Sequence, residues 1–175
     1  MTTRVARLTT RVAWLLTGLA WAGRSLLELA RPNYYDPVSP LDWAAVLSFS
    51  LAWLLSALAV LLLCRDLGAA PVRAIGLLFA IAASVAGLAN LVEDALGQSW
   101  GGTPYVVGFL VAWISLIPLA IVIWASGARR VAILPVALFA SIALFNTGGG
   151  LLILVVATAL VLAGRWFQGP SAVST

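Results

Sequence analysis

Five polar side chains of types that bind cations or carry protons stand within long apolar runs of the sequence. The segment GLANLVEDALG contains Asn90, Glu93 and Asp94 in five consecutive residues, and an earlier run contains Arg24 and Glu28, four residues apart. Carboxylates accept protons and bind hard cations, an amide supplies a neutral oxygen, and arginine supplies a permanent counter-charge. Such side chains inside an apolar segment are candidates for a functional site.

The spacing of these residues places them on two helix faces. Small and then polar residues recur at spacings of four and three along one run: Gly76, Ala80, Ala83, Gly87, Asn90 and Asp94. Polar and aromatic residues repeat the same spacing along the other: Thr10, Trp14, Thr17, Trp21, Arg24 and Glu28. Residues at these spacings share a face of a helix. Small residues allow close helix packing in lipid, so the first face is predicted to pack into a bundle, with Glu93 beside it.

The two faces are predicted to meet at one depth. An unpaired charge at the centre of a bilayer costs about 2.5 to 3.5 kcal/mol on insertion scales, so mutual pairing is favoured. We therefore predict that Arg24 bridges toward Asp94 or Glu93, with Asn90 capping the network. Two interpretations stay open: a structural clasp that fixes helix register, or a site for a cation, proton or ligand. The second is favoured by further acids near Arg31, which are Glu28, Asp36 and Asp42.

The missing residue types exclude several chemistries. The chain has no histidine, no lysine, a single cysteine (Cys64) and no methionine beyond Met1. It therefore lacks the usual ligands for zinc, haem or iron–sulfur clusters, a histidine for a nucleophilic triad and a lysine for a Schiff base. We expect no cofactor, no metal site and no intramolecular disulfide.

Composition predicts an all-α integral membrane protein. Of the 175 residues, 63% are hydrophobic and 9% are charged, far from the balance of a soluble domain. About 20 apolar residues cross the hydrocarbon core as a helix, because backbone polar groups there must bond internally. The chain is predicted to be one membrane domain over residues 1–175, a helical bundle without an extramembrane domain. Its six transmembrane helices are predicted at about 12–30, 41–64, 74–96, 104–125, 131–145 and 149–164.

The last two predicted helices are short. At 1.5 Å per residue they reach about 22 to 24 Å, so a re-entrant hairpin or one broken helix is an alternative to two ordinary spans. Pro118 lies inside the fourth helix and Pro135 near the start of the fifth, where each removes a backbone hydrogen bond and favours a kink.

Arginine placement predicts the orientation. With a cytoplasmic N-terminus and C-terminus, eight of the ten arginines lie inside, and only Arg24 and Arg31 lie toward the outside. The basic residues are all arginine and the chain is rich in alanine and leucine, as in GC-rich bacterial genomes. We expect a multi-pass protein of the bacterial inner membrane. The start also resembles a secretory signal with an AWA at 20–22, but the polar face continues through it, so a retained helix is predicted.

Aromatic residues near the predicted helix ends indicate interfacial belts. Tyr34, Tyr35, Trp43 and Trp100 are predicted to lie at the outer interface, and Trp124 and Trp166 at the inner one.

No characterised family is recognised in the sequence, and three functions stay open. The first is a non-enzymatic membrane subunit or accessory protein held together by the polar network. The second is a small transporter or channel with Asp94 and Glu93 as cation or proton ligands and Arg24 as their counter-charge. The third is an enzyme acting on a lipid headgroup through Glu93 or Asp94, although a nucleophile or metal set is missing. The partners expected are the lipid bilayer and another membrane protein or a second copy, but not nucleic acid, because the arginines fall at helix ends.

Overall fold

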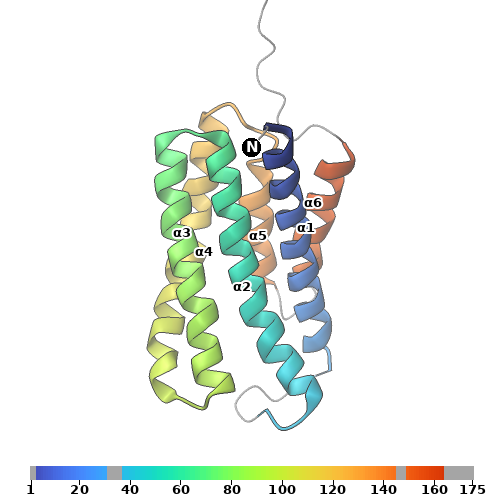
Figure 1. Cartoon of the computed structure of the whole chain (residues 1–175), viewed down its shortest axis with the longest axis vertical. Coiled ribbons are helices and arrows are strands. Elements are labelled where there is room, and N and C mark those ends of the chain that lie inside the picture. Colours follow the sequence, from blue (N-terminus) through green and yellow to red (C-terminus); the bar gives the residue numbers. More distant parts are fainter. Residues whose placement is uncertain (1–2, 31–36, 145–148, 164–175) are drawn as a thin grey trace, which may run out of the picture.

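The described part of the chain folds into six α-helices, which confirms the all-α prediction. The structure is a computed structural model that describes residues 3–30, 37–144 and 149–163. The helices are α1 (Thr3–Glu28), α2 (Pro40–Leu67), α3 (Ala70–Asn90), α4 (Gly102–Ala125), α5 (Ile133–Ala143) and α6 (Gly150–Leu162). A π-helical turn, η1 (Leu91–Ala95), continues α3, and a 3-10 turn, η2 (Ser99–Gly101), precedes α4. Successive helices run in opposite directions along the bundle (Figure 1).

Helix bounds differ from the predicted spans mainly at the start of the chain and in the last two helices. Helix α1 begins at Thr3 rather than at residue 12, because its arginine-bearing start favours helix although it is not apolar. Helices α5 and α6, of 11 and 13 residues, are shorter than predicted. Pro135 lies in the first turn of α5, where helical N–H groups have no partner within the helix, whereas Pro118 lies inside the continuous α4.

Three helical segments are long and apolar enough to cross a membrane. They are Pro40–Leu67, Ala70–Ala95 and Ser99–Ala125. Helices α5 and α6 are apolar but shorter. Helix α1 has sufficient length, with 26 residues, but it carries several charges.

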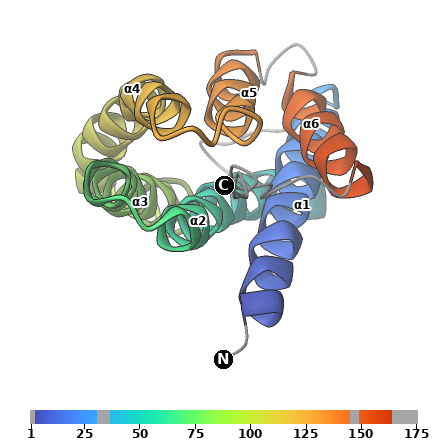
Figure 2. The ribbon, with the colours of Figure 1, turned by 90° about the horizontal axis from the view of Figure 1, so that it is seen from above.

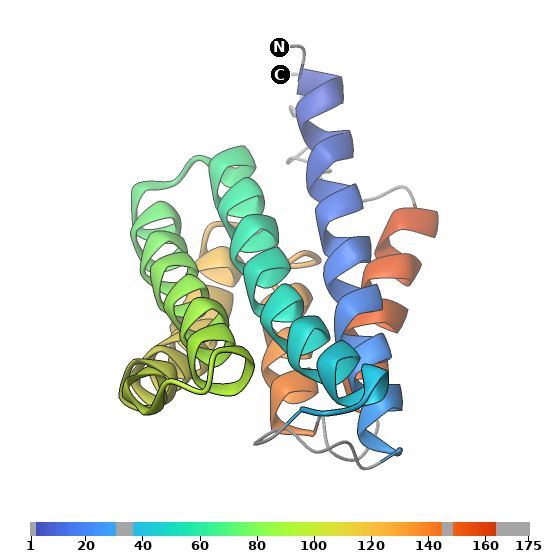
Figure 3. The same cartoon turned by 60° about the horizontal axis from the view of Figure 1, so that its bottom comes forward.

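The six helices form a closed ring. Each helix packs against its neighbours in sequence, and α6 packs against α1 to complete the circuit (Figure 2). Figure 3 shows α3 with α4 on one side of α2 and α1 with α6 on the other. The ring brings the first and last helices into direct contact although they are far apart in sequence.

Two glycines allow the close approach of α1 and α6. A Cβ on Gly18 would lie 2.6 Å from the Cα of Leu154, and one on Gly150 would lie 2.1 Å from the carbonyl oxygen of Trp21. The N–H of Gly150 donates to Ser25 Oγ at 3.0 Å. Any larger residue at these positions would separate the two helices.

A row of aromatic rings crosses the interior of the ring. Trp21 of α1 contacts Trp53 of α2 at 5.5 Å between centroids, and Trp53 contacts Phe109 of α4 at 5.7 Å. The row continues to α5, where Trp113 stacks on Phe139 at 4.7 Å. The contact of Trp53 with Phe109 links α2 and α4, which are not neighbours in the ring, and aromatic pairs add to the stability gained by burial.

Charge is divided between the two ends of the bundle. At the end where α1 begins and α2 ends, called the basic end, the arginines with described side chains are Arg7, Arg11, Arg65, Arg73, Arg129 and Arg130, with Asp66 as the acid (Figure 1). At the opposite, acidic end the described charges are Glu28, Asp42, Glu93, Asp94 and Arg24. Exposed tryptophans stand at both ends: Trp43 (39%) and Trp100 (64%) at the acidic end and Trp124 (57%) at the basic end. Tyr34, Tyr35 and Trp166 lie outside the described residues.

Candidate functional site

The polar face of α1 points into the bundle. Five residues that share this face by their spacing are all buried: Thr10, Trp14, Thr17, Trp21 and Arg24. The indole N–H of Trp21 donates to Ser56 Oγ of α2 at 3.0 Å. Near the basic end, Thr10 donates to Asp66 of α2 at 2.6 Å. The face therefore joins α1 to α2 at several depths.

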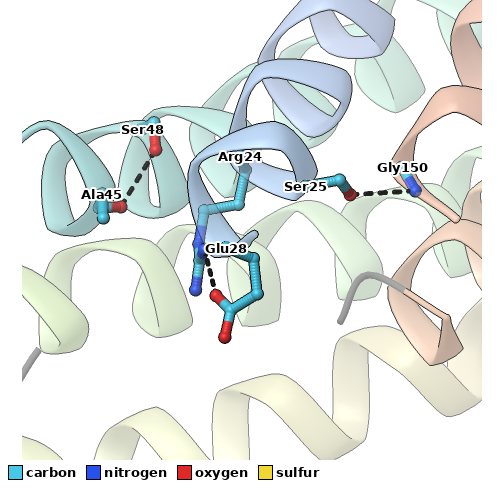
Figure 4. Close-up of polar contacts among 6 residues, drawn as sticks. All are labelled: Arg24, Ser25, Glu28, Ala45, Ser48 and Gly150. Carbon is cyan, nitrogen blue, oxygen red and sulfur yellow. Dashed lines mark hydrogen bonds and ion pairs between the residues drawn. The ribbon is translucent and has the colours of Figure 1, made fainter. Parts of the chain in front are cut away.

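Arg24 forms an ion pair with Glu28 on its own helix. The Nη1 atom of Arg24 lies 2.5 Å from Oε2 of Glu28, and the two side chains are 4% and 22% exposed. Figure 4 shows both side chains projecting from the same side of α1, while Ser25 points to Gly150 of α6. The guanidinium also lies over the ring of Phe49, 5.3 Å from its centroid. A one-turn spacing allows this pairing, and the aromatic face adds a cation–π attraction.

Asn90 joins α3 to α2. Its amide nitrogen donates to Ser50 Oγ at 3.0 Å, and both side chains are buried. The sequence predicts Asn90 as a cap on the charged network, but this hydrogen bond goes to a neutral hydroxyl of α2. The small face of α3 explains the contact: a Cβ on Gly87 would lie 3.0 Å from the carbonyl oxygen of Ser50, so the two backbones approach closely here.

Glu93 and Asp94 lie on the π-helical turn η1, both half-buried. The turn is closed by a hydrogen bond from the N–H of Leu96 to the carbonyl oxygen of Leu91, five residues earlier, at 3.2 Å. A π turn holds more residues than an α turn, so it rotates the side chains that follow relative to the face extrapolated from α3. Asp94 consequently leaves the fully buried face that runs from Gly76 to Asn90.

The carboxylate of Glu93 lies against the start of α4. A Cβ on Gly102 would be 2.7 Å from Oε1 of Glu93, and one on Gly101 would be 2.8 Å from the backbone nitrogen of Glu93. A carboxylate at a helix N-terminus is stabilised by the helix dipole and by N–H groups that have no partner within the helix. The sequence did not predict this position of Glu93, although the glycine pair in SWGGTP indicates a close approach of two backbones.

Asp94 makes no hydrogen bond or ion pair within the part of the chain that the structure describes. Its charge nevertheless lies within interaction range of Glu93 and Arg24. We call the ion pair of Arg24 and Glu28 on α1, together with Asp94 of η1 within electrostatic range of Arg24, the charged group. Among the described residues Arg24 forms its ion pair with Glu28, and the predicted bridge from Arg24 to Asp94 or Glu93 is not formed.

The remaining acids have other positions. Asp42 accepts from the backbone N–H of Ser39 at 2.9 Å, while Ser39 Oγ accepts from the N–H of Asp42 at 3.2 Å. This reciprocal cap starts α2. Asp36 and Arg31 lie outside the described residues. Within residues 3–30, 37–144 and 149–163, no group of three or more histidine, cysteine or acidic side chains is arranged to hold a metal ion.

Comparison with protein-family models, with curated proteins and with solved structures gave no match. The interpretation of the charged group therefore depends on its geometry alone.

Proposed function

We propose that the chain is a multi-pass protein of the bacterial inner membrane that crosses six times, with both termini in the cytoplasm. The three long apolar segments, the even number of helices and the concentration of arginine at one end support this topology. At 1.5 Å per residue, α5 and α6 measure about 16 and 20 Å, against about 30 Å of hydrocarbon. Their crossing therefore requires a locally thinned bilayer or apolar residues beyond the helix ends.

Within that membrane we propose a non-enzymatic role as a subunit or accessory protein, whose acidic end is held by polar contacts between and within helices. The observation that carries this proposal is the use of the predicted site residues in packing. Asn90 bonds to α2, Glu93 lies against α4, and Arg24 pairs with Glu28 and lies over the ring of Phe49. Polar contacts of this kind fix helix register and contribute about 0.6 kcal/mol each in membrane bundles.

Affinity purification of a tagged chain from its native membrane tests this role. A stoichiometric membrane-protein partner is expected after mild detergent extraction. The test variant is Arg24→Leu, which disturbs the acidic end and is expected to lower recovery of that partner. Purification of the chain without any partner, together with ion flux in reconstituted vesicles, would contradict the subunit role.

A small transporter or channel is the second candidate function, with Asp94 and Glu93 as cation or proton ligands and Arg24 as their counter-charge. Two observations favour it. Asp94 has no hydrogen bond or ion pair with the described residues, and it lies on a π turn, an element frequent at functional sites. A half-buried carboxylate near an arginine can bind a cation and release it when the carboxylate pairs with the arginine instead.

Flux measurements with matched variants separate the two functions. Asp94→Asn and Glu93→Gln preserve shape and remove charge, and Asp66→Asn at the basic end is the control. Transport predicts a pH-dependent flux that is lost in Asp94→Asn at unchanged thermal stability. The subunit role predicts no flux in the native chain and lower thermal stability in Glu93→Gln, because its carboxylate then no longer stabilises the start of α4.

A further inference from the structure

We propose that the turn between α4 and α5 binds the headgroup of an anionic glycerophospholipid, with one acyl chain of that lipid along the outer face of α4. This inference depends on the proposed membrane insertion and adds a partner of defined chemistry to it. It is based on a part of the molecule remote from Arg24 and Asp94.

The outer face of α4 offers a continuous apolar strip. Its members recur at spacings of three and four and are all exposed: Val107 (55%), Leu110 (43%), Ile114 (58%), Ile117 (49%), Ile121 (62%) and Trp124 (57%). The hydrocarbon of one leaflet is about 15 Å thick, which corresponds to about ten helical residues. The section from Ile114 to Trp124 therefore matches one acyl chain of the leaflet at the basic end.

The strip ends at an aromatic ring with arginines directly beyond it. The guanidinium of Arg129 lies over the ring of Trp124, 5.5 Å from its centroid. The chain leaves α4 through Gly127, whose φ is 86° and whose N–H donates to the carbonyl oxygen of Trp124 at 3.1 Å. This tight turn keeps Arg129 and the exposed Arg130 close to the end of the strip.

The order of these side chains matches the chemistry of a phospholipid. Apolar residues meet the acyl chain, and the indole ring suits the ester region, where its N–H can donate to a carbonyl. The two guanidinium groups lie at the level of the phosphate and bind its oxygens through paired N–H donors. A headgroup with a net negative charge is favoured over a zwitterionic one because the described arginines of the basic end outnumber its acid, and Asp66 is paired with Arg65 at 2.9 Å.

Arg73 provides a matched comparison at the same end. It is exposed in the first turn of α3 and stands above an apolar strip through Leu77 and Ile81. It has no arginine next to it in sequence and no tryptophan within its turn. If lipid binding depended on total charge alone, removal of Arg73 and removal of Arg129 would weaken it equally. A local site predicts that only removal of Arg129 or Arg130 weakens it.

Native mass spectrometry of the full chain in detergent tests the site, with phosphatidylglycerol and phosphatidylcholine of equal chain length as probes. A basic residue near an anionic surface contributes about fivefold in affinity, so two arginines predict about a 25-fold preference for phosphatidylglycerol. The double variant Arg129→Gln with Arg130→Gln is expected to reduce the preference to about twofold or less. Arg73→Gln is expected to retain it, and Trp124→Leu to lower it by a few-fold. Thermal unfolding in the same detergent confirms that each variant is folded.

Several outcomes would overturn the proposal. They are an unchanged preference in the double variant, an equal loss in Arg73→Gln, and displacement of the lipid by glycerol phosphate at similar concentration, which would indicate a phosphate site without a lipid. If both lipids bind the native chain equally, the headgroup site is wrong and membrane insertion is unaffected. If neither lipid binds, the membrane proposal fails as well.

Discussion

Arginines at the two ends of the bundle have different surroundings. Arg24, at the acidic end, is 4% exposed, pairs with Glu28 and lies over Phe49. Arg129, at the basic end, is exposed and stacks on the exposed Trp124. Both guanidinium groups use an aromatic face, but only Arg24 is removed from solvent and needs a carboxylate. The comparison teaches that depth in the bundle, rather than residue type, decides whether an arginine stabilises the fold.

Removal of each arginine should give the largest contrast between the ends. Arg24→Leu leaves the partly buried carboxylate of Glu28 without its cation, and loss of one member of a buried pair costs about 3 kcal/mol. Arg129→Leu removes an exposed charge and is expected to change the free energy of unfolding by less than about 0.5 kcal/mol. Chemical unfolding in detergent micelles measures both. Equal effects would show that burial of Arg24 does not matter.

A smaller effect is expected from a methyl group added where the acidic end is most tightly packed. Gly101 has φ −64°, so alanine fits its backbone conformation, but a Cβ there would lie 2.7 Å from the carbonyl oxygen of Ala89. Gly101→Ala is expected to destabilise by about 2 kcal/mol, because backbone must shift. Gly23→Ala is the control, since no atom lies within 4 Å of its Cβ position and alanine favours helix. A neutral Gly101→Ala would mean that α4 does not approach η1 as closely as described.

The smallest effect concerns the neutral hydrogen bond near the acidic end. A double-mutant cycle of Asn90→Ala and Ser50→Ala should give a coupling energy of about 0.6 to 1 kcal/mol, the usual size for interhelical bonds in lipid. Ser48 supplies the control, because its Oγ donates within its own helix to the carbonyl oxygen of Ala45 at 2.9 Å, as Figure 4 shows. Coupling of Asn90 with Ser48 should be absent. If it matched the coupling with Ser50, the effect would reflect general loosening of α2.

The sequence predicted much of the fold and less of the candidate site. Periodicity and apolar runs predicted six helices and the inward faces from Thr10 to Arg24 and from Gly76 to Asn90, which are buried. The start of α1 was predicted less well, because hydropathy indicates which residues lie in the hydrocarbon and not where a helix begins or ends. The sides of the membrane on which the termini lie stay a prediction.

Contacts in the site depended on features without a local signal. Extrapolation of the α3 spacing gave Asp94 the same direction as Asn90, but the π turn η1 interrupts that spacing. The partner of Asn90 is Ser50, 40 residues away, and the partner of Arg24 is Glu28, four residues away. The four-residue spacing allows Arg24 to pair with Glu28. It does not show whether Arg24 pairs with Glu28 or with one of the acids of η1.

By itself the sequence determined the helical class, the separation of charge into two ends and the faces that pack inward. These properties follow from the local chain, because hydropathy and a period of 3.6 residues act along each helix separately. The tertiary structure decided the closure of the ring between α1 and α6, the placement of Glu93 at the start of α4 and the isolation of Asp94 from hydrogen-bond partners within the described residues. These three features depend on how closely the backbones of two helices approach. Glycines such as Gly101 and Gly150 allow that approach, but they have this effect only where two helices are already in contact.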